Sequence, residues 1–180
     1  DVLGALGEGG RGVLLAEYRG YGGCAGSPTE AGLYADAEGA LGEIGRRGVG
    51  LERVILVGRS LGTGVAVEMA VRHDVRGMVL ISPYTSMPDL ARRHYPIVPR
   101  GAVAAILPDR FDSMAKAARL RVATIVLHGT SDDVVPFDMG ERLARAIPRA
   151  RFVRLDGVGH NDVYLLALDR VMEALREVAR

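Results

Sequence analysis

A serine flanked by glycines occupies the centre of residues 58–62 (GRSLG), a spacing typical of a sharp turn that presents a nucleophile. The apolar residues 54–57 (VILV) before it predict a buried strand. Residues 61–71 after it, rich in alanine, valine and methionine, predict a helix. In this context Ser60 is expected to project at the carboxyl end of the strand, beside the positive end of the helix.

The alternative interpretation is an ordinary glycine-rich turn. The five-residue pattern alone is weak, because the chain contains 24 glycines. The strand before it and the helix after it favour the nucleophile. We expect Gly58 and Gly62, which have no Cβ, to let strand and helix approach closely around the serine.

His160 is the predicted general base. A serine hydroxyl is nucleophilic at neutral pH only beside a positioned base, usually an imidazole held by a carboxylate. His160 follows the last predicted strand in the loop 157–160 (GVGH) and directly precedes the last helix. Because functional groups collect at the carboxyl ends of parallel strands, His160 is expected to reach Ser60.

The other three histidines fit this role less well. His73 ends the helix after the serine and is expected at the far edge of the sheet. His94 lies in a proline-rich segment and is expected at the surface; contact with the substrate is the alternative. His128 ends a strand on the correct side, but we expect a buried histidine that is hydrogen-bonded to the backbone.

Two candidate acids, Asp132 and Asp133, lie in the loop 129–136 (GTSDDVVP) that leaves the penultimate strand. Either carboxylate could face His160. Either could instead be a turn residue or cap the helix that follows, which is the common role of aspartate in such loops.

The composition excludes several classes of protein. The 23 basic and 22 acidic residues nearly balance, so no polyanion or membrane surface is implied as a partner. The arginines are scattered without interleaved aromatic residues, which argues against nucleic-acid binding. Cys24 is the sole cysteine, so it forms no internal disulfide; we interpret it as a bystander, and expect no metal or organic cofactor. No apolar run could span a bilayer, which favours a cytoplasmic location unless an anchor lies upstream.

Strands and helices alternate along the chain, which predicts one α/β domain over residues 1–180 with a mostly parallel sheet covered on both faces. The predicted strands are 12–18, 54–57, 76–82, 121–128 and 151–155, and the predicted helices include the tail of one before residue 8, one from about 28 to 48, 61–71, 136–147, and one from 161 to the end. Residues 83–120 hold most of the prolines and are expected to form an irregular insertion with short helices.

Two helices have distinctive patterns. In the first, Ser27 is the predicted N-cap, Pro28 the first helical residue, and Glu30 the partner that closes a capping box. In the last, apolar residues at spacings of four, three, four and three predict one continuous helix from Asn161 with a single apolar face.

These motifs resemble the α/β-hydrolase superfamily, and most of all its abhydrolase branch, which contains serine-aminopeptidase-like hydrolases and protein depalmitoylases. The similar segments cover essentially the whole chain in the family's order: EYRGYGGCAGSPTEAGLYADAEGAL, VGRSLGTGVAVEMA, ISPYTSMPDLA, RFDSMAKAARL, VLHGTSDDVVPFDMGERL and GVGHND. The resemblance implies Ser60 as nucleophile, His160 as base, and Asp132, with Asp133 as runner-up, as acid. It also implies hydrolysis of an ester, thioester or amide of a small or medium acyl substrate through an acyl-enzyme.

Acyl transfer also needs two N–H donors aimed at the developing oxyanion. Leu61, directly after the nucleophile, can supply one. In the family the second comes from a His-Gly loop after an earlier strand, and that strand also lies between those matching 12–18 and 54–57. This sequence shows neither the His-Gly loop nor that strand. We therefore expect a three-layer α/β-hydrolase fold without its N-terminal strands, part of a longer hydrolase and weakly active or inactive alone.

Tyr21, Tyr84 and Met87 lie in loops expected to border the substrate pocket, although plain packing is the commoner role of such residues. One rival hypothesis is a non-catalytic binding module that kept the triad but lacks a complete oxyanion hole. A second is a flavodoxin-like or nucleotide-binding domain. That domain would need a phosphate loop such as Gly-x-Gly-x-x-Gly after its first strand, and none follows the predicted strand 12–18.

Overall fold

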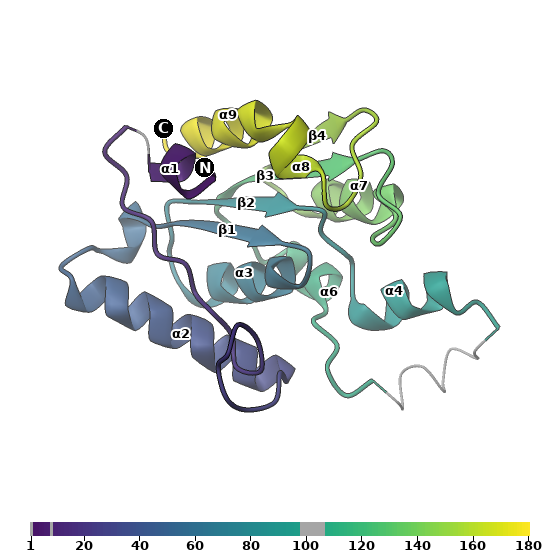
Figure 1. The fold of residues 1–180 in the computed structure, drawn as a ribbon, viewed down its shortest axis with the longest axis horizontal. Coiled ribbons are helices and arrows are strands. Elements are labelled where there is room, and N and C mark those ends of the chain that lie inside the picture. The colour runs from purple at the N-terminus through teal and green to yellow at the C-terminus, as the bar shows by residue number, and fades with distance from the viewer. Residues whose placement is uncertain (1, 8, 98–106) are drawn as a thin grey trace.

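A computed structural model describes residues 2–7, 9–97 and 107–180 and shows helices on both faces of a parallel sheet (Figure 1). The four strands lie in the order β1-β2-β3-β4, and every neighbouring pair is parallel. Their bounds are Ile55–Arg59 (β1), Gly77–Ile81 (β2), Ala123–Gly129 (β3) and Ala150–Leu155 (β4). The predicted parallel sheet, covered on both sides, is confirmed.

Helices form a layer on each face of the sheet (Figure 1). One face of the sheet packs against α1 (Val2–Gly7), α8 (Val163–Leu166) and α9 (Leu168–Val178). The other face packs against α3 (Leu61–Arg72), α6 (Ser113–Ala117) and α7 (Phe137–Ala146), and α2 (Glu30–Arg46) lies on the outside of α3. A 3₁₀ turn at Leu51–Arg53 precedes β1, and α4 (Met87–His94) follows β2. No helix within the described ranges is both long and apolar enough to cross a membrane.

The central strand β2 shows why a strand of this sheet is a continuous run of apolar residues in the sequence. Met78 and Leu80 point into the core beneath α3 and α7, whereas Val79 and Ile81 point into the core beneath α9. All four side chains are fully buried. A strand covered on both faces needs apolar residues at every position rather than at alternate ones.

The predicted strand at 12–18 is wrong. These residues form no strand, and Val13, Leu14 and Leu15 are exposed. A strand exists only through hydrogen bonds to a neighbour. Among the described residues β1 pairs with β2 alone, so the apolar run at 12–18 has no partner ladder.

The predicted start of the first long helix is also wrong. Helix α2 begins at Glu30, and the Thr29 hydroxyl, rather than that of Ser27, accepts a hydrogen bond from the N–H of Gly32. Glu30 does not close a capping box, because its carboxylate accepts hydrogen bonds from the Tyr34 hydroxyl (2.6 Å) and the Arg110 N–H (2.7 Å). The start of α2 is therefore tied to the segment that follows residue 106.

The single C-terminal helix expected from Asn161 is two helices. Helix α8 ends at Leu166, and Ala167 (φ −140°, ψ 28°) breaks the path before α9. Between β2 and β3 the chain forms the short helices α4 and α6, as expected for residues 83–120; residues 98–106 of that segment lie outside the described residues.

Candidate active site

Ser60 occupies a strained turn between β1 and α3. Its φ of 50° and ψ of −119° lie in a region that side-chain-bearing residues rarely adopt. Its N–H donates to the carbonyl of Ile81 (2.9 Å), and its own carbonyl accepts from the N–H (2.9 Å) and the hydroxyl (2.6 Å) of Thr63. Strain of this kind costs about 1–3 kcal/mol and persists only where neighbouring contacts hold it.

Of the two glycines expected to relieve crowding here, only Gly58 does so. A Cβ on Gly58 would lie 2.6 Å from the carbonyl oxygen of Gly62, whereas a Cβ on Gly62 would meet only the Tyr18 hydroxyl, at 3.8 Å. The second tight position is Gly64, where a Cβ would lie 2.4 Å from the Tyr84 hydroxyl. Close helix–strand approach therefore depends on Gly58, and close packing of α3 on its neighbours depends on Gly64.

The structure brings Ser60, His160 and Asp132 into one hydrogen-bonded line. His160 Nε2 lies 3.1 Å from Ser60 Oγ, and His160 Nδ1 lies 2.8 Å from Asp132 Oδ2. A carboxylate can only accept, so Nδ1 carries the hydrogen and Nε2 is free to accept the serine proton. The His160 side chain is 7% exposed and that of Asp132 is fully buried.

Asp132 is held in place by more than the histidine. Its Oδ1 accepts hydrogen bonds from the N–H groups of Val134 (3.0 Å) and Val135 (2.7 Å). Burial by itself would raise the pKa of the Asp132 carboxyl, yet hydrogen bonds from His128 and the Val135 N–H hold that pKa well below its ordinary value. Asp132 therefore stays ionised and orients His160. Asp133, the runner-up, is exposed, and its carboxylate makes no hydrogen bond within the described ranges.

The remaining histidines lie away from the Ser60 hydroxyl. His73 ends α3 and pairs with Glu38 (2.7 Å), and His94 is exposed with Nε2 2.7 Å from the carbonyl oxygen of Val134. His128 is fully buried and its Nε2 donates to the carbonyl of Val135 (2.9 Å), as predicted. The sequence did not reveal that the same nitrogen lies 3.4 Å from Asp132 Oδ2.

Arg59 is a site residue that the sequence analysis missed. Its Nη2 donates to the main-chain carbonyl of His160 (2.8 Å) and to Oδ1 of Asn161 (2.8 Å). It thereby links the Ser60 turn to the His160 loop. The elbow pattern leaves this position unspecified, so the sequence carried no signal for it.

Leu61 directly follows Ser60 and contacts Tyr84. Leu61 is the first residue of α3, and no hydrogen bond of its N–H is found in the described part of the chain. Tyr84 is 1% exposed, and its hydroxyl donates to the Leu61 carbonyl (3.3 Å). Met87 begins α4 and is half-buried against the same core. Tyr84 therefore packs in the core and does not line an open pocket.

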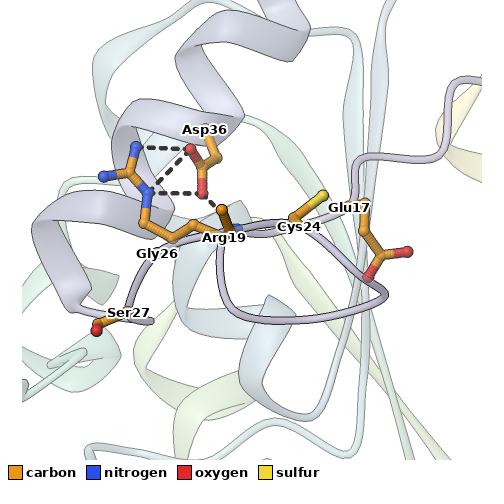
Figure 2. A pocket seen from close by; sticks show the side chains of 7 residues that line it. Glu17, Arg19, Cys24, Gly26, Ser27 and Asp36 are labelled. Carbon is orange, nitrogen blue, oxygen red and sulfur yellow. Dashed lines mark hydrogen bonds and ion pairs between the residues drawn. The ribbon is translucent and has the colours of Figure 1, made fainter.

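Tyr21 lies in an exposed loop that is anchored to α2. Figure 2 shows the anchor, where Arg19 pairs with Asp36 through its guanidinium (2.7 Å) and its N–H (2.9 Å). Cys24 is exposed and borders the shallow hollow of about 300 Å³ beside this pair, a hollow that Ser60 does not line. Within the described ranges, no three or more His, Cys, Asp or Glu side chains form a metal-binding group.

The sequence matches the alpha/beta hydrolase family over residues 1–119. An uncharacterized protein of Mycobacterium tuberculosis is 41% identical over 166 residues, which cover 91% of this chain and 58% of that protein. Alpha/beta hydrolase domain-containing protein 17C of Homo sapiens is 33% identical over 172 residues, which cover 92% of this chain and 48% of that protein. The chain spans about half the length of the curated relatives it matches.

Solved structures resemble the fold. The esterase RhEst1 from Rhodococcus superimposes with a TM-score of 0.67 at 22% identity, covering 91% of this chain and 78% of that one. A thermophilic esterase from Thermogutta terrifontis gives a TM-score of 0.64 at 22% identity, covering 89% and 76%. These likenesses confirm the predicted fold class.

Proposed function

The chain belongs to the alpha/beta hydrolase family, and from this premise we propose that it is a serine hydrolase that cleaves an ester, thioester or amide through an acyl-enzyme. The observation that carries the proposal is the line from Ser60 Oγ through His160 to Asp132, with distances of 3.1 Å and 2.8 Å. Both distances are hydrogen-bond distances, and the first lies within the reach that transfer of the serine proton to His160 requires.

The reaction begins when Ser60 Oγ attacks the substrate carbonyl carbon and its proton moves to His160 Nε2. Asp132, fully buried and ionised, stabilises the imidazolium that forms. The tetrahedral intermediate collapses as His160 returns the proton to the leaving group. Water, deprotonated by His160, then attacks the acyl carbon. His160 returns that proton to Ser60 Oγ as the bond from Oγ to the acyl carbon breaks, which frees the acid product and the serine.

The oxyanion of the tetrahedral intermediate is stabilised by the N–H of Leu61 at the positive end of α3. Two such donors are typical of acyl transfer, and removal of one costs about 10²–10³ in kcat. The Tyr84 hydroxyl does not serve as the second, because it is buried and donates to the Leu61 carbonyl. We expect slow turnover, because no second donor is identified among the described residues.

The preferred substrate is a small or medium acyl ester, supported by the nearly neutral chain and by the esterases that share its fold. The test is turnover of p-nitrophenyl esters of increasing acyl length by the chain and by Ser60→Ala. Slow turnover that Ser60→Ala abolishes supports the proposal. Turnover that survives in Ser60→Ala refutes it.

A further inference from the structure

A basic groove of about 490 Å³ lies at the amino ends of the strands, at the opposite end of the sheet from Ser60. Its walls come from the end of α3, from the loops that enter β2, β3 and β4, and from the end of α9. In Figure 1 these are the strand ends opposite the arrowheads. A ligand in this groove would not touch the Ser60 turn, so the groove is a separate site.

Five arginines line the groove and carry its charge: Arg76, Arg119, Arg121, Arg149 and Arg180. All five are exposed, and none forms an ion pair with an Asp or Glu side chain of the described residues. Nearby arginines differ, since Arg72 pairs with Glu68 and Arg151 pairs with Glu177.

Two carboxylates also line the groove, and they do not cancel this charge. Glu177 is already held by Arg151, with 2.8 Å between Nε and Oε1, so it leaves Asp74 as the one lining carboxylate without an ion pair in the described structure. His73 lines the groove as well and is occupied by Glu38. Positive charge therefore exceeds negative charge at this site.

Two of the arginines are partly fixed by main-chain contacts. Arg149 Nη1 donates to the carbonyl of Arg121 (3.2 Å), and Arg76 Nη2 donates to the carbonyl of Ala179 (2.9 Å). A guanidinium has five N–H donors, so Arg149 retains most of them for a ligand. Arg76 also donates from Nε to the Ala179 carbonyl (3.2 Å) and from Nη2 to the Arg180 carbonyl, so it retains chiefly the two N–H groups of Nη1. Arg119 and Arg121 make no side-chain hydrogen bond within the described residues.

We propose that this groove binds a small molecule that carries phosphate groups. Guanidinium groups pair with phosphate through two parallel hydrogen bonds, which favours arginine over lysine at such sites. The volume lies in the range of small-molecule sites. Val71, Val75 and Val122 add apolar wall for an organic part of the ligand. The inference is independent of the hydrolase reaction.

Pyrophosphate is the probe, and its binding to the chain is measured by isothermal titration calorimetry at low ionic strength. The test variant is Arg119→Gln/Arg121→Gln, which removes two charges without removing a side-chain hydrogen bond. The matched control is Arg46→Gln/Arg47→Gln, which removes two charges at the end of α2, where both side chains are 71% exposed.

We expect saturable binding that weakens about tenfold or more in the groove variant and changes little in the control. Ser60→Ala should bind like the parent chain, which separates this result from any failure of the hydrolase proposal. The proposal is overturned by absence of saturable binding, or by equal weakening in both double variants. It is also overturned if phosphatidylcholine–phosphatidylserine vesicles bind the chain and pyrophosphate does not.

Discussion

Arg59 and His160 are 101 residues apart in the sequence, yet the Arg59 guanidinium donates to the His160 carbonyl over 2.8 Å. The residue directly before Ser60 therefore holds the main chain of His160. The Nε of Arg59 is buried without a partner among the described residues, so this side chain is confined although part of it reaches solvent. A small displacement of the His160 loop would lengthen the 3.1 Å contact to Ser60.

Replacement of Arg59 by methionine should misplace His160. We expect the rate at which a fluorophosphonate labels Ser60 to fall about tenfold, because proton transfer depends steeply on position. Asn161→Ala is the control, since it removes the other acceptor of Arg59 and leaves the His160 carbonyl in place. A labelling rate in Arg59→Met equal to that of the parent would contradict the positioning role.

Replacement of His128 by leucine should destabilise the fold. It leaves the Val135 carbonyl without its buried donor, which costs about 1–3 kcal/mol of unfolding free energy, and it removes a contact of Asp132. His94→Leu is matched, because His94 contacts the neighbouring carbonyl of Val134 but is exposed, and it should change little. Urea denaturation of both variants decides the point, and equal losses would contradict the account.

The glycines of the turn should respond differently to alanine. Gly58→Ala forces a Cβ to within 2.6 Å of the Gly62 carbonyl oxygen and should cost about 2 kcal/mol or more of unfolding free energy. Gly62→Ala meets only an ordinary contact in a helix and should be neutral, or stabilising by up to about 1 kcal/mol. Thermal unfolding measures both. Similar destabilisation by the two substitutions would contradict the geometry.

The stability conferred by Asp132 should depend on pH. Its folded pKa lies below the unfolded value of about 3.9, so the ionised carboxylate stabilises the fold above about pH 4. That contribution is lost as the pH falls through the folded pKa. In urea titrations, the unfolding free energy of Asp132→Asn should therefore lie about 1–3 kcal/mol below that of the parent near neutral pH. This gap in unfolding free energy should shrink in acid. Asp133→Asn should lack this gap; a gap that widens in acid would argue against the assignment.

Much of the fold could be predicted because the patterns were local. The apolar run of β2 reflects burial on both faces, and the strand–serine–helix order at Ser60 reflects a turn that its own residues specify. The start of α2, in contrast, depends on a contact with a residue far away in the sequence. Glu30 is engaged by Arg110, 80 residues away, which the capping pattern could not reveal.

The site could be predicted only as far as each residue had a motif. Ser60 and His160 follow strands and lie beside glycines, so they were identifiable. The choice of Asp132 over Asp133 rested on a resemblance, and the geometry that now supports it includes N–H groups within its own loop. Arg59 and His128 act through contacts that no pattern encodes.

The central claim is that His160 activates the hydroxyl of Ser60, and fluorophosphonate labelling read by intact mass and peptide mapping tests it most directly. We predict one adduct per chain, located on Ser60, absent from Ser60→Ala and much slower to form in His160→Gln. This readout does not need the second oxyanion donor that full turnover requires. An unlabelled parent chain, or an adduct that persists in Ser60→Ala, would contradict the claim.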